Sequence, residues 1–297
     1  SNLLLGEDKV CVVEADEFDR SFLQLHPNIA CITSMDADHL DIYKEAAALQ
    51  ESFVAFSQQV SETLIVAKGL PLKGLTYAVN EDADYKAINL KIDSGKYIFD
   101  VKTPVSEIKN IEFHLPGKHN VMNALAALAM ADVYGISLEE IKESLSTFKG
   151  VQRRFTYKIK TNDFVLIDDY AHHPTEIAAV QNAIREMYPN EKVLVVFQPH
   201  LFSRTRDFVD DFANELSKFD EVLLLDIYPA RELPIPGVDA NWLLSKINNS
   251  SKKMTQKSTL LQDIEKSSAK VVAMLGAGDI GVMITEITSQ LLKKEQI

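Results

Sequence analysis

Residues 164–187 read FVLIDDYAHHPTEIAAVQNAIREM, and this stretch decides the fold class of the C-terminal half of the chain. Its first part, FVLID, is apolar up to an acidic tip, which is typical of a parallel strand buried on both faces. Its second part, PTEIAAVQNAIREM, spaces apolar residues as an amphipathic helix does. Strand-like runs recur in KVLVVF, EVLLLDIY and KVVAMLG, and helical stretches recur in RDFVDDFANELSKF, ANWLLSKI and DIGVMITEITSQLLKK. This alternation predicts a doubly wound parallel α/β sheet over residues 151–297.

The N-terminal half starts with two short apolar runs that end in acidic residues, KVCVVEADE and NIACITSMDADH. We expect both to be buried parallel strands that carry carboxylates at their carboxyl ends. Residues 45–60 have the apolar spacing of an amphipathic helix, and residues 75–113 alternate in short pieces between turn signals. The sequence therefore predicts a second α/β region with a small antiparallel patch.

Two helices follow this patch. The first is long and rich in alanine; Asn120 takes the N-cap position after the Pro-Gly stop, and Gly135 ends the helix. Ser137 and Glu140 have the spacing of a capping box at the start of the second helix. We place a domain boundary near Gly150, which divides the chain into residues 1–150 and 151–297.

The composition limits the class of protein. The chain has 297 residues, 46% hydrophobic and 25% charged, which is typical of a globular protein long enough for two domains. A net charge of −12 argues against a general nucleic-acid binder. No apolar run approaches the roughly 20 residues that cross a bilayer, and nothing resembles a secretory signal, so we expect a cytoplasmic protein. Cys11 and Cys31 lie in apolar runs and are expected to be small buried hydrophobes.

In parallel sheets ligands gather beyond the carboxyl ends of the strands, so the residues that follow each apolar run are the first candidates for a site. The first tip, Glu14 to Glu17, could hold Mg²⁺ through carboxylate oxygens. The second tip, Asp36 to Asp41, adds the imidazole of His39. Because imidazole is an uncommon Mg²⁺ ligand, this tip taken alone could equally be a zinc site or a solvated acidic turn.

Three further tips lie in the C-terminal half. Residues 168–176 combine two acids, a tyrosine and two histidines, which indicates either a site or an elaborate helix cap. Residues 198–206 place Arg204 and Arg206 at the start of a helix, where the dipole disfavours positive charge. Their partners are therefore Asp207 and Asp210 or, as we prefer, a ligand phosphate or carboxylate. The glycine-rich turn at 276–281 could cradle an anion, but its late place in the chain argues against a dinucleotide site.

Taken in order, eight strings resemble the successive signatures of the Mur ligase family: EADEFDRSFLQLHP, DADHLDIY, GKHNVMNALAA, GVQRRF, DDYAHHPTE, FQPHLFSRTRD, YPARE and LGAGDIG. They run from Val12 to Gly281, nearly the whole chain. The resemblance implies that residues 1–150 are part of a central ATP-binding domain and residues 151–297 a Rossmann-like ligase domain. It also implies peptidoglycan precursor synthesis in the cytoplasm, by a monomer or homodimer that contacts neither nucleic acid nor membrane.

Within the family, EADEFD, DDYAHHPTE, FQPH and SRTRD are most similar to the ligase that joins L-alanine to UDP-N-acetylmuramate. Such a ligase uses ATP and Mg²⁺ to convert the muramyl carboxylate into an acyl phosphate, which the amine of alanine attacks. Since charge builds on phosphoryl oxygens during transfer, cationic groups are needed there. The alternatives are the ligase that recycles muropeptides, which full-length protein would distinguish by its use of L-alanine or a preformed tripeptide, and a non-catalytic nucleotide-binding module.

The resemblance assigns a role to individual residues. Glu14 and His39 would hold Mg²⁺. His119, Asn120 and Asn123 would contact the adenine of ATP, although an N-cap and a polar helix face would account for Asn120. Arg154 and Asp169 would reach the ribose or phosphates. The muramyl carboxylate and the incoming alanine would be lined by Tyr170, His172, His200, Arg204 and Arg206, of which the two histidines and two arginines would be catalytic, and Glu232 would meet the alanine ammonium.

The chain also departs from the family pattern. The glycine-rich phosphate loop that the family carries before the EADE strand, and the domain that grips the UDP-sugar, do not occur in these 297 residues. We therefore expect this polypeptide alone to have no ligase turnover. Leu201 stands where some family members carry arginine, and residues 45–60 lack the lysine that other members carbamoylate.

Overall fold

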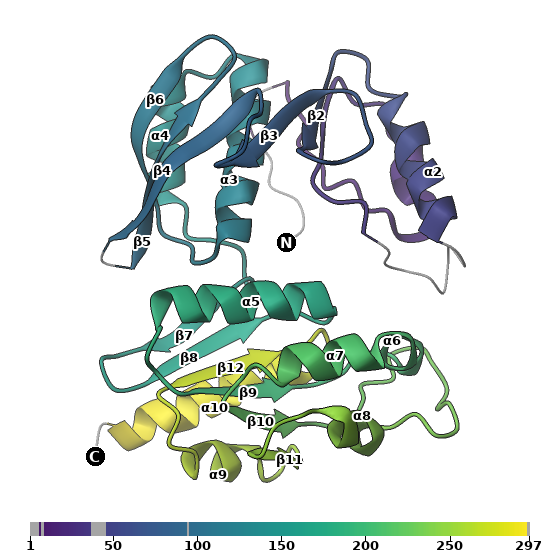
Figure 1. Ribbon diagram of the computed structural model, residues 1–297, viewed down its shortest axis with the longest axis vertical. Helices are drawn as coiled ribbons and strands as arrows, with labels where there is room; N and C mark the ends of the chain where they lie inside the picture. Colours follow the sequence, from purple (N-terminus) through teal and green to yellow (C-terminus); the bar gives the residue numbers. More distant parts are fainter. Residues whose placement is uncertain (1–5, 7–8, 37–45, 94, 296–297) are drawn as a thin grey trace.

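The computed structural model describes residues 6, 9–36, 46–93 and 95–295, and these form two six-stranded sheets (Figure 1). The first sheet has the order β1-β2-β3-β4-β5-β6. Its strands are β1 (Ile29–Ile32), β2 (Thr63–Ala67), β3 (Leu75–Val79), β4 (Tyr85–Asp93), β5 (Lys96–Lys102) and β6 (Glu107–Phe113). Strands β1 to β4 are parallel, and β4, β5 and β6 are antiparallel.

Helices cover the first sheet on different sides. Helix α3 (Lys118–Tyr134) and α4 (Leu138–Thr147) form one core with the strands from β2 to β6. The 3-10 helix η1 (Phe18–Gln24) and α2 (Ala46–Ser57) pack against β1 and β2 through the aromatic residues Phe22 and Phe56. The expected helix at 45–60 and the capping box of Ser137 and Glu140 are confirmed.

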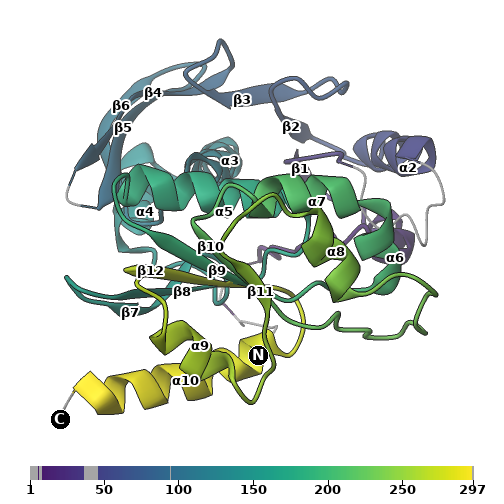
Figure 2. The same ribbon diagram turned by 60° about the horizontal axis from the view of Figure 1, so that its bottom comes forward.

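The second sheet has the order β11-β10-β9-β12-β8-β7. Its strands are β7 (Thr156–Lys160), β8 (Val165–Asp169), β9 (Val193–Phe197), β10 (Glu221–Leu224), β11 (Lys252–Met254) and β12 (Val271–Leu275), of which only β7 is antiparallel to its neighbour. The helices are α5 (Pro174–Met187), α6 (Phe202–Asp207), α7 (Val209–Leu216), α8 (Ala240–Lys246), α9 (Leu260–Glu265) and α10 (Ile280–Glu295). Helices α5, α7 and α8 pack on one face, and α9 and α10 on the other (Figure 2). The doubly wound α/β fold is therefore confirmed.

The two sheets meet where α3 approaches α5 (Figure 1). The hydroxyl of Tyr97, a buried residue of β5, donates to the carboxylate of Glu186 in α5, and the amide of Gly117 donates to the same hydroxyl at 3.2 Å. Lys118 Nζ lies 3.7 Å from Glu186 Oε1. These contacts fix the N-terminus of α3 against the second sheet. The division into domains at Gly150 stays a prediction, with α4 ending before it and β7 starting after it.

Several local predictions are wrong. The run KVCVVE is not a strand: residues 10–14 are irregular and exposed, Val12 at 88%, because no described strand pairs with them. Cys11 is consequently exposed, and Cys31 is only partly buried; both are free thiols. Asn120 is not the N-cap of α3. Gly117 holds that position, and Asn120 lies one turn further in.

Residues 248–258 are polar enough to suggest an exposed loop, but they contribute edge strand β11. Strands β3 and β4, expected to be antiparallel, are parallel. Among the helices of the described residues, none is long and apolar enough to cross a membrane.

Candidate functional site

The carboxyl ends of three strands meet at one edge of the second sheet. In the ladder, Leu275 of β12 lies opposite both Asp169 of β8 and Phe197 of β9. The turns that follow these strands, at 170–173, 198–201 and 276–279, are therefore neighbours in space. This is the place where open parallel sheets bind ligands.

Four rings line this edge. The ring centroids of Tyr170 and His172 are 5.1 Å apart, those of His172 and His200 are 5.9 Å apart, and His200 stacks on Tyr228 at 5.7 Å. The structure thus brings together three of the residues predicted to meet the substrate, which come from the turns after β8 and β9. Tyr228, which the sequence analysis did not single out, completes the row from the segment after β10.

His172 and Glu176 form a pair at the start of α5. His172 Nδ1 lies 2.9 Å from the carbonyl oxygen of Tyr170 and 3.2 Å from Glu176 Oε2. Burial by itself would raise the pKa of Glu176, but the hydrogen bonds and charge of His172, with the charge of Arg154, lower it to about 2. Glu176 also accepts the amides of His172 and His173, and His173 is the N-cap of α5. The turn after β8 therefore caps α5 and also orients the side chain of His172.

His200 is held as a neutral imidazole. Burial first, and then the positive charges of His172, Arg204 and Arg231, lower its pKa to about 4. Its Nδ1 is buried and has no hydrogen-bond partner among the described residues. A neutral ring with an open nitrogen can accept a proton, as a general base does, and a pKa of about 4 makes that base a weak one.

The two arginines of the fourth tip do not stand at the start of a helix, which corrects the prediction. Helix α6 has only six residues, so Arg204 and Arg206 fall in its last turn, where positive charge is favourable. Arg206 Nε lies 2.7 Å from Asp207 Oδ1, as one alternative held, whereas Asp210 pairs with Lys246 at 2.8 Å. Arg204 is 8% exposed.

Glu232 reaches the same region from the segment after β10. Its Oε2 accepts the amide of Ser203 at 2.9 Å, and its Oε1 accepts the hydroxyl of Ser203. The carboxylate thus anchors the first turn of α6. The neighbouring Arg231 has its Cζ 5.3 Å from the ring centroid of Phe18 in η1, a second contact between the two sheets' regions.

Asp169 is buried at the end of β8, and each of its two carboxylate oxygens accepts a hydrogen bond from a backbone amide. Its Oδ2 accepts the amide of Phe155 at 2.6 Å and its Oδ1 accepts the amide of Ala171 at 2.8 Å. Burial raises its pKa to about 6 in spite of these two bonds. Next to Phe155, the exposed Arg154 has its Nη1 3.3 Å from Glu176 Oε1. Asp169 therefore fixes the turn that presents Arg154.

The predicted nucleotide contacts on α3 lie in its first two turns. Asn120 is buried, and its Nδ2 donates to the carbonyl of Pro116 at 2.6 Å. Asn123 is exposed, and His119 is half-buried with its pKa lowered by burial and by the charge of Arg154. His119 and Arg154, from the two sheets' regions, thus lie close enough for their charges to interact.

Of the two residues predicted to hold magnesium, the structure describes only Glu14. Glu14 is exposed in an irregular segment, and His39 lies outside the described residues. Among the residues that the structure does describe, no group of three or more histidine, cysteine and acidic side chains is placed to hold a metal.

The glycine-rich turn after β12 is filled by the protein itself. Gln198 Oε1 accepts the amide of Ile280 at 3.0 Å, and its Nε2 donates to Asp279 Oδ1 at 2.7 Å. The start of α10 is thereby capped by the side chain of the first residue after β9, in place of the anion that the sequence allowed. Sequence reasoning missed this role of Gln198, since nothing local to either turn indicates it.

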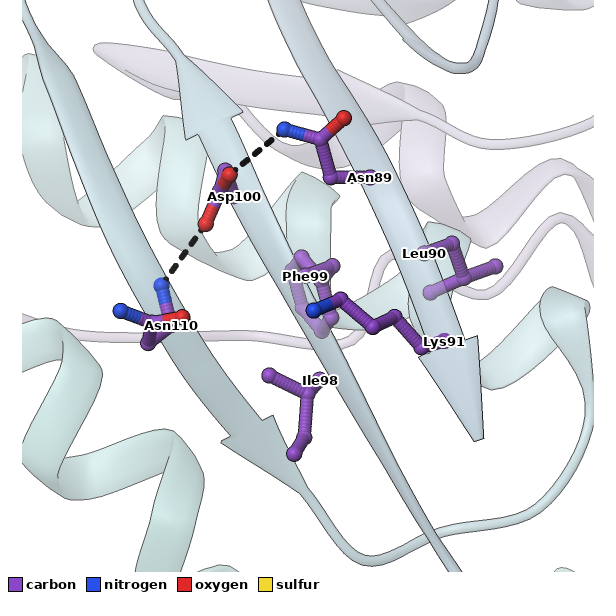
Figure 3. A pocket seen from close by; sticks show the side chains of 7 residues that line it. All are labelled: Asn89, Leu90, Lys91, Ile98, Phe99, Asp100 and Asn110. Atoms are coloured by element: carbon purple, nitrogen blue, oxygen red, sulfur yellow. Dashed lines mark hydrogen bonds between the residues drawn. The ribbon is translucent and has the colours of Figure 1, made fainter. Parts of the chain in front are cut away.

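A hollow of about 400 Å³ opens on the antiparallel patch of the first sheet (Figure 3). Asp100 of β5 accepts the side-chain amide of Asn89 at 2.7 Å and the backbone amide of Asn110 at 2.8 Å, and both asparagines have positive φ. These bonds lower the pKa of Asp100. Asp100 thus ties two β-bulges together, and its oxygens are already engaged.

Comparison with known proteins places the chain in a family. The family model "Mur ligase middle domain" matches residues 2–131, and "Mur ligase, glutamate ligase domain" matches residues 153–284. The UDP-N-acetylmuramate–L-alanine ligase of Phocaeicola vulgatus is 44% identical over 306 residues, which cover 99% of this chain and 67% of that protein. The chain belongs to the Mur ligase family.

Other Mur ligases are similar as well. The UDP-N-acetylmuramate–L-alanine ligase of Flavobacterium psychrophilum is 58% identical over 99% of the chain, and the chain spans 66% of its length. The crystal structure of UDP-N-acetylmuramate-alanine ligase from Thermotoga maritima matches with a TM-score of 0.75 and 25% identity, covering 95% of this chain and 63% of that one. Folylpolyglutamate synthase of Mycobacterium tuberculosis shares the fold, with a TM-score of 0.66, 12% identity, and coverage of 92% and 65%.

Proposed function

We propose that the protein to which these residues belong joins L-alanine to UDP-N-acetylmuramate while it converts ATP to ADP and phosphate. The observation that carries the proposal is the convergence of Tyr170, His172, His200 and Arg204 at the carboxyl edge of the second sheet. The relatives named for this reaction support it, at 58% identity over 99% of the chain.

The proposed reaction has two steps. An oxygen of the muramyl carboxylate attacks the γ-phosphorus of ATP, and ADP leaves with the electrons of the broken phosphorus–oxygen bond. The amine of alanine then attacks the acyl carbon, and the resulting tetrahedral intermediate expels inorganic phosphate to form the amide. Positive side chains at the phosphoryl group stabilise the charge that develops there.

The described residues suit the demands of this chemistry. Arg204 and Arg206 would hold the muramyl carboxylate and its phosphorylated form. Because the pKa of His200 is lowered to about 4, its ring is neutral near pH 7 and would accept the proton that the attacking amine loses. Arg154, close to His119 of α3, would reach the ribose or phosphates of ATP.

Magnesium is expected from the family, and Glu14 is the described residue of the predicted pair. Since no metal-binding group of three is found among the described residues, the fit is not shown and we assign no step to the ion. The cytoplasmic location and the monomeric or dimeric state likewise remain predictions.

The decisive experiment uses protein made from the whole reading frame that encodes these residues. Phosphate release is measured with ATP, UDP-N-acetylmuramate, and either L-alanine or a preformed tripeptide. We expect release with L-alanine; release with the tripeptide alone would favour a muropeptide-recycling ligase. No release with either would favour a nucleotide-binding module without catalysis.

A pair of variants links the activity to the site. His200→Gln removes the proposed base, and we expect kcat to fall by about 10² to 10⁴-fold, the usual contribution of general-base catalysis. His114→Gln changes an exposed histidine between β6 and α3 and should leave kcat unchanged. Equal rates in the two variants would refute the role given to His200.

A further inference from the structure

Arg153 lies beside this site and has no part in the proposed reaction steps. It lies in the turn between α4 and β7 with a left-handed φ of 59°, a conformation that costs a residue other than glycine free energy. Its carbonyl oxygen accepts the amide of Tyr170 at 2.7 Å. Its backbone thus binds directly to the turn that carries Tyr170 and His172.

The guanidinium of Arg153 makes contacts in three directions. Its Nε lies 3.3 Å from Asp168 Oδ1 at the end of β8, and its Nη2 donates to the carbonyl of Gly276 after β12. Its Cζ lies 5.0 Å from the ring centroid of Tyr170, within the range of a cation–π interaction. One side chain therefore connects the loop before β7, the turn after β8 and the turn after β12.

The start of α10 is shaped to receive this group. A Cβ atom at Gly281 would lie 2.5 Å from both Cζ and Nη1 of Arg153, so the helix approaches the guanidinium closely only because residue 281 is glycine. Lysine could not replace these contacts, since its ammonium is a point charge without the planar fork that reaches a carboxylate and a carbonyl together.

The contact with Arg153 restricts a ring that the core does not hold in place. Tyr170 is 37% exposed, so packing in the core does not fix its ring. The ring also has other neighbours: the Cζ of Arg154 lies 5.9 Å from its centroid, and the ring of His172 lies 5.1 Å away. Arg153 is the closer of the two arginines, and its bond to the carbonyl of Gly276 connects the ring to the turn after β12.

We propose that Arg153 is a positioning residue of the site: its guanidinium sets the Tyr170 ring, and with it the substrate side of the cluster, relative to the turn after β12. This inference rests on the proposed function for its consequence in catalysis. The contact geometry that carries it does not depend on which substrates bind.

The test compares Arg153→Lys with Arg185→Lys in protein from the whole reading frame. Arg185 is a suitable control because it also binds backbone carbonyls, those of Glu191 and Lys218, and a carboxylate, that of Asp220, but at the opposite end of the strands. We expect Arg153→Lys to lower kcat/KM for UDP-N-acetylmuramate by on the order of 10²-fold, as a misplacement of about 1 Å can do. The KM for ATP should change much less, and Arg185→Lys should leave both values near those of the unchanged protein.

A second measurement does not require turnover. In protein labelled with ¹³C-tyrosine, the Tyr170 ring signal, assigned with Tyr170→Phe, should move in Arg153→Lys and stay in place in Arg185→Lys. If the ring signal does not move, or if it moves while kcat/KM falls no more than in Arg185→Lys, the proposal is overturned. If the unchanged protein has no ligase activity, the proposed function fails, and the ring signal alone decides whether Arg153 positions Tyr170.

Discussion

Gly117 offers a sharp test of how α3 is placed against the second sheet. It caps α3 with φ 93° and ψ 135°, a conformation that is largely restricted to glycine. A Cβ there would lie 2.5 Å from Cε1 and 2.7 Å from Nδ1 of His119, and 2.9 Å from Cβ of Ala183 in α5. Gly117→Ala would therefore strain the backbone and push His119 out of its place.

The magnitude follows from two separate costs. The backbone conformation costs an alanine about 1–3 kcal/mol, and forcing an extra methyl into close-packed surroundings costs about 1–3 kcal/mol more. Gly135→Ala is the control, because Gly135 ends the same helix at φ 103° but has nothing within 4 Å of its Cβ position. That control should cost only about 1–2 kcal/mol, the left-handed strain alone.

Urea unfolding followed by circular dichroism measures both free energies of unfolding. We expect Gly117→Ala to be the more destabilised of the two by about 1–3 kcal/mol, which is the packing cost. ATP binding measured by calorimetry should weaken in Gly117→Ala alone, because His119 is displaced. A Gly117→Ala protein no less stable than Gly135→Ala, with unchanged ATP affinity, would show that α3 does not dock as described.

Three further outcomes are expected. The pKa of Asp169 is about 6 in the folded protein and 3.8 in an unfolded chain, so between these pH values the folded state binds a proton more readily. The stabilisation that this proton brings is complete below pH 4 and is lost as the pH rises to 6. Asp169→Asn should remove roughly 3 kcal/mol of this pH dependence of the free energy of unfolding, measured by urea unfolding across that range. For His200 the shift is opposite, so stability should fall as pH drops from 6.5 towards 4, and an NMR titration of its ring should give a pKa well below that of an exposed histidine. Gln198→Ala leaves the amide of Ile280 without its acceptor and should cost about 1–3 kcal/mol in urea unfolding, whereas an unchanged free energy would argue against the cap.

The sequence predicted the second sheet well because its strands are apolar on both faces and its helices are amphipathic. In runs such as VLVVF at 193–197 every side chain is apolar, so the strand is stable only when both of its faces are buried, and all five residues are buried. The same reasoning failed for KVCVVE, where the pattern is equally apolar but no described strand supplies a ladder. Apolar composition indicates that a segment can be buried; whether it is buried depends on its neighbours in space.

The site was predictable in part. The strand tips correctly indicated where Tyr170, His172 and His200 would gather, since parallel strands end at a common edge. The sequence could not show that Gln198 fills the glycine-rich turn or that Arg153 joins three turns, because these contacts connect residues 82 and 123 positions apart. Arg204 and Arg206 were placed at the wrong end of their helix because the break at Phe208 has no proline or glycine to mark it.

The central claim is that this edge of the second sheet activates a carboxylic acid as its acyl phosphate. The most direct measurement uses UDP-N-acetylmuramate with ¹⁸O in its muramyl carboxylate, together with ATP, L-alanine and protein from the whole reading frame. One ¹⁸O atom should appear in the inorganic phosphate, because the carboxylate oxygen leaves with the phosphoryl group. Amide formation with phosphate free of ¹⁸O would contradict the account.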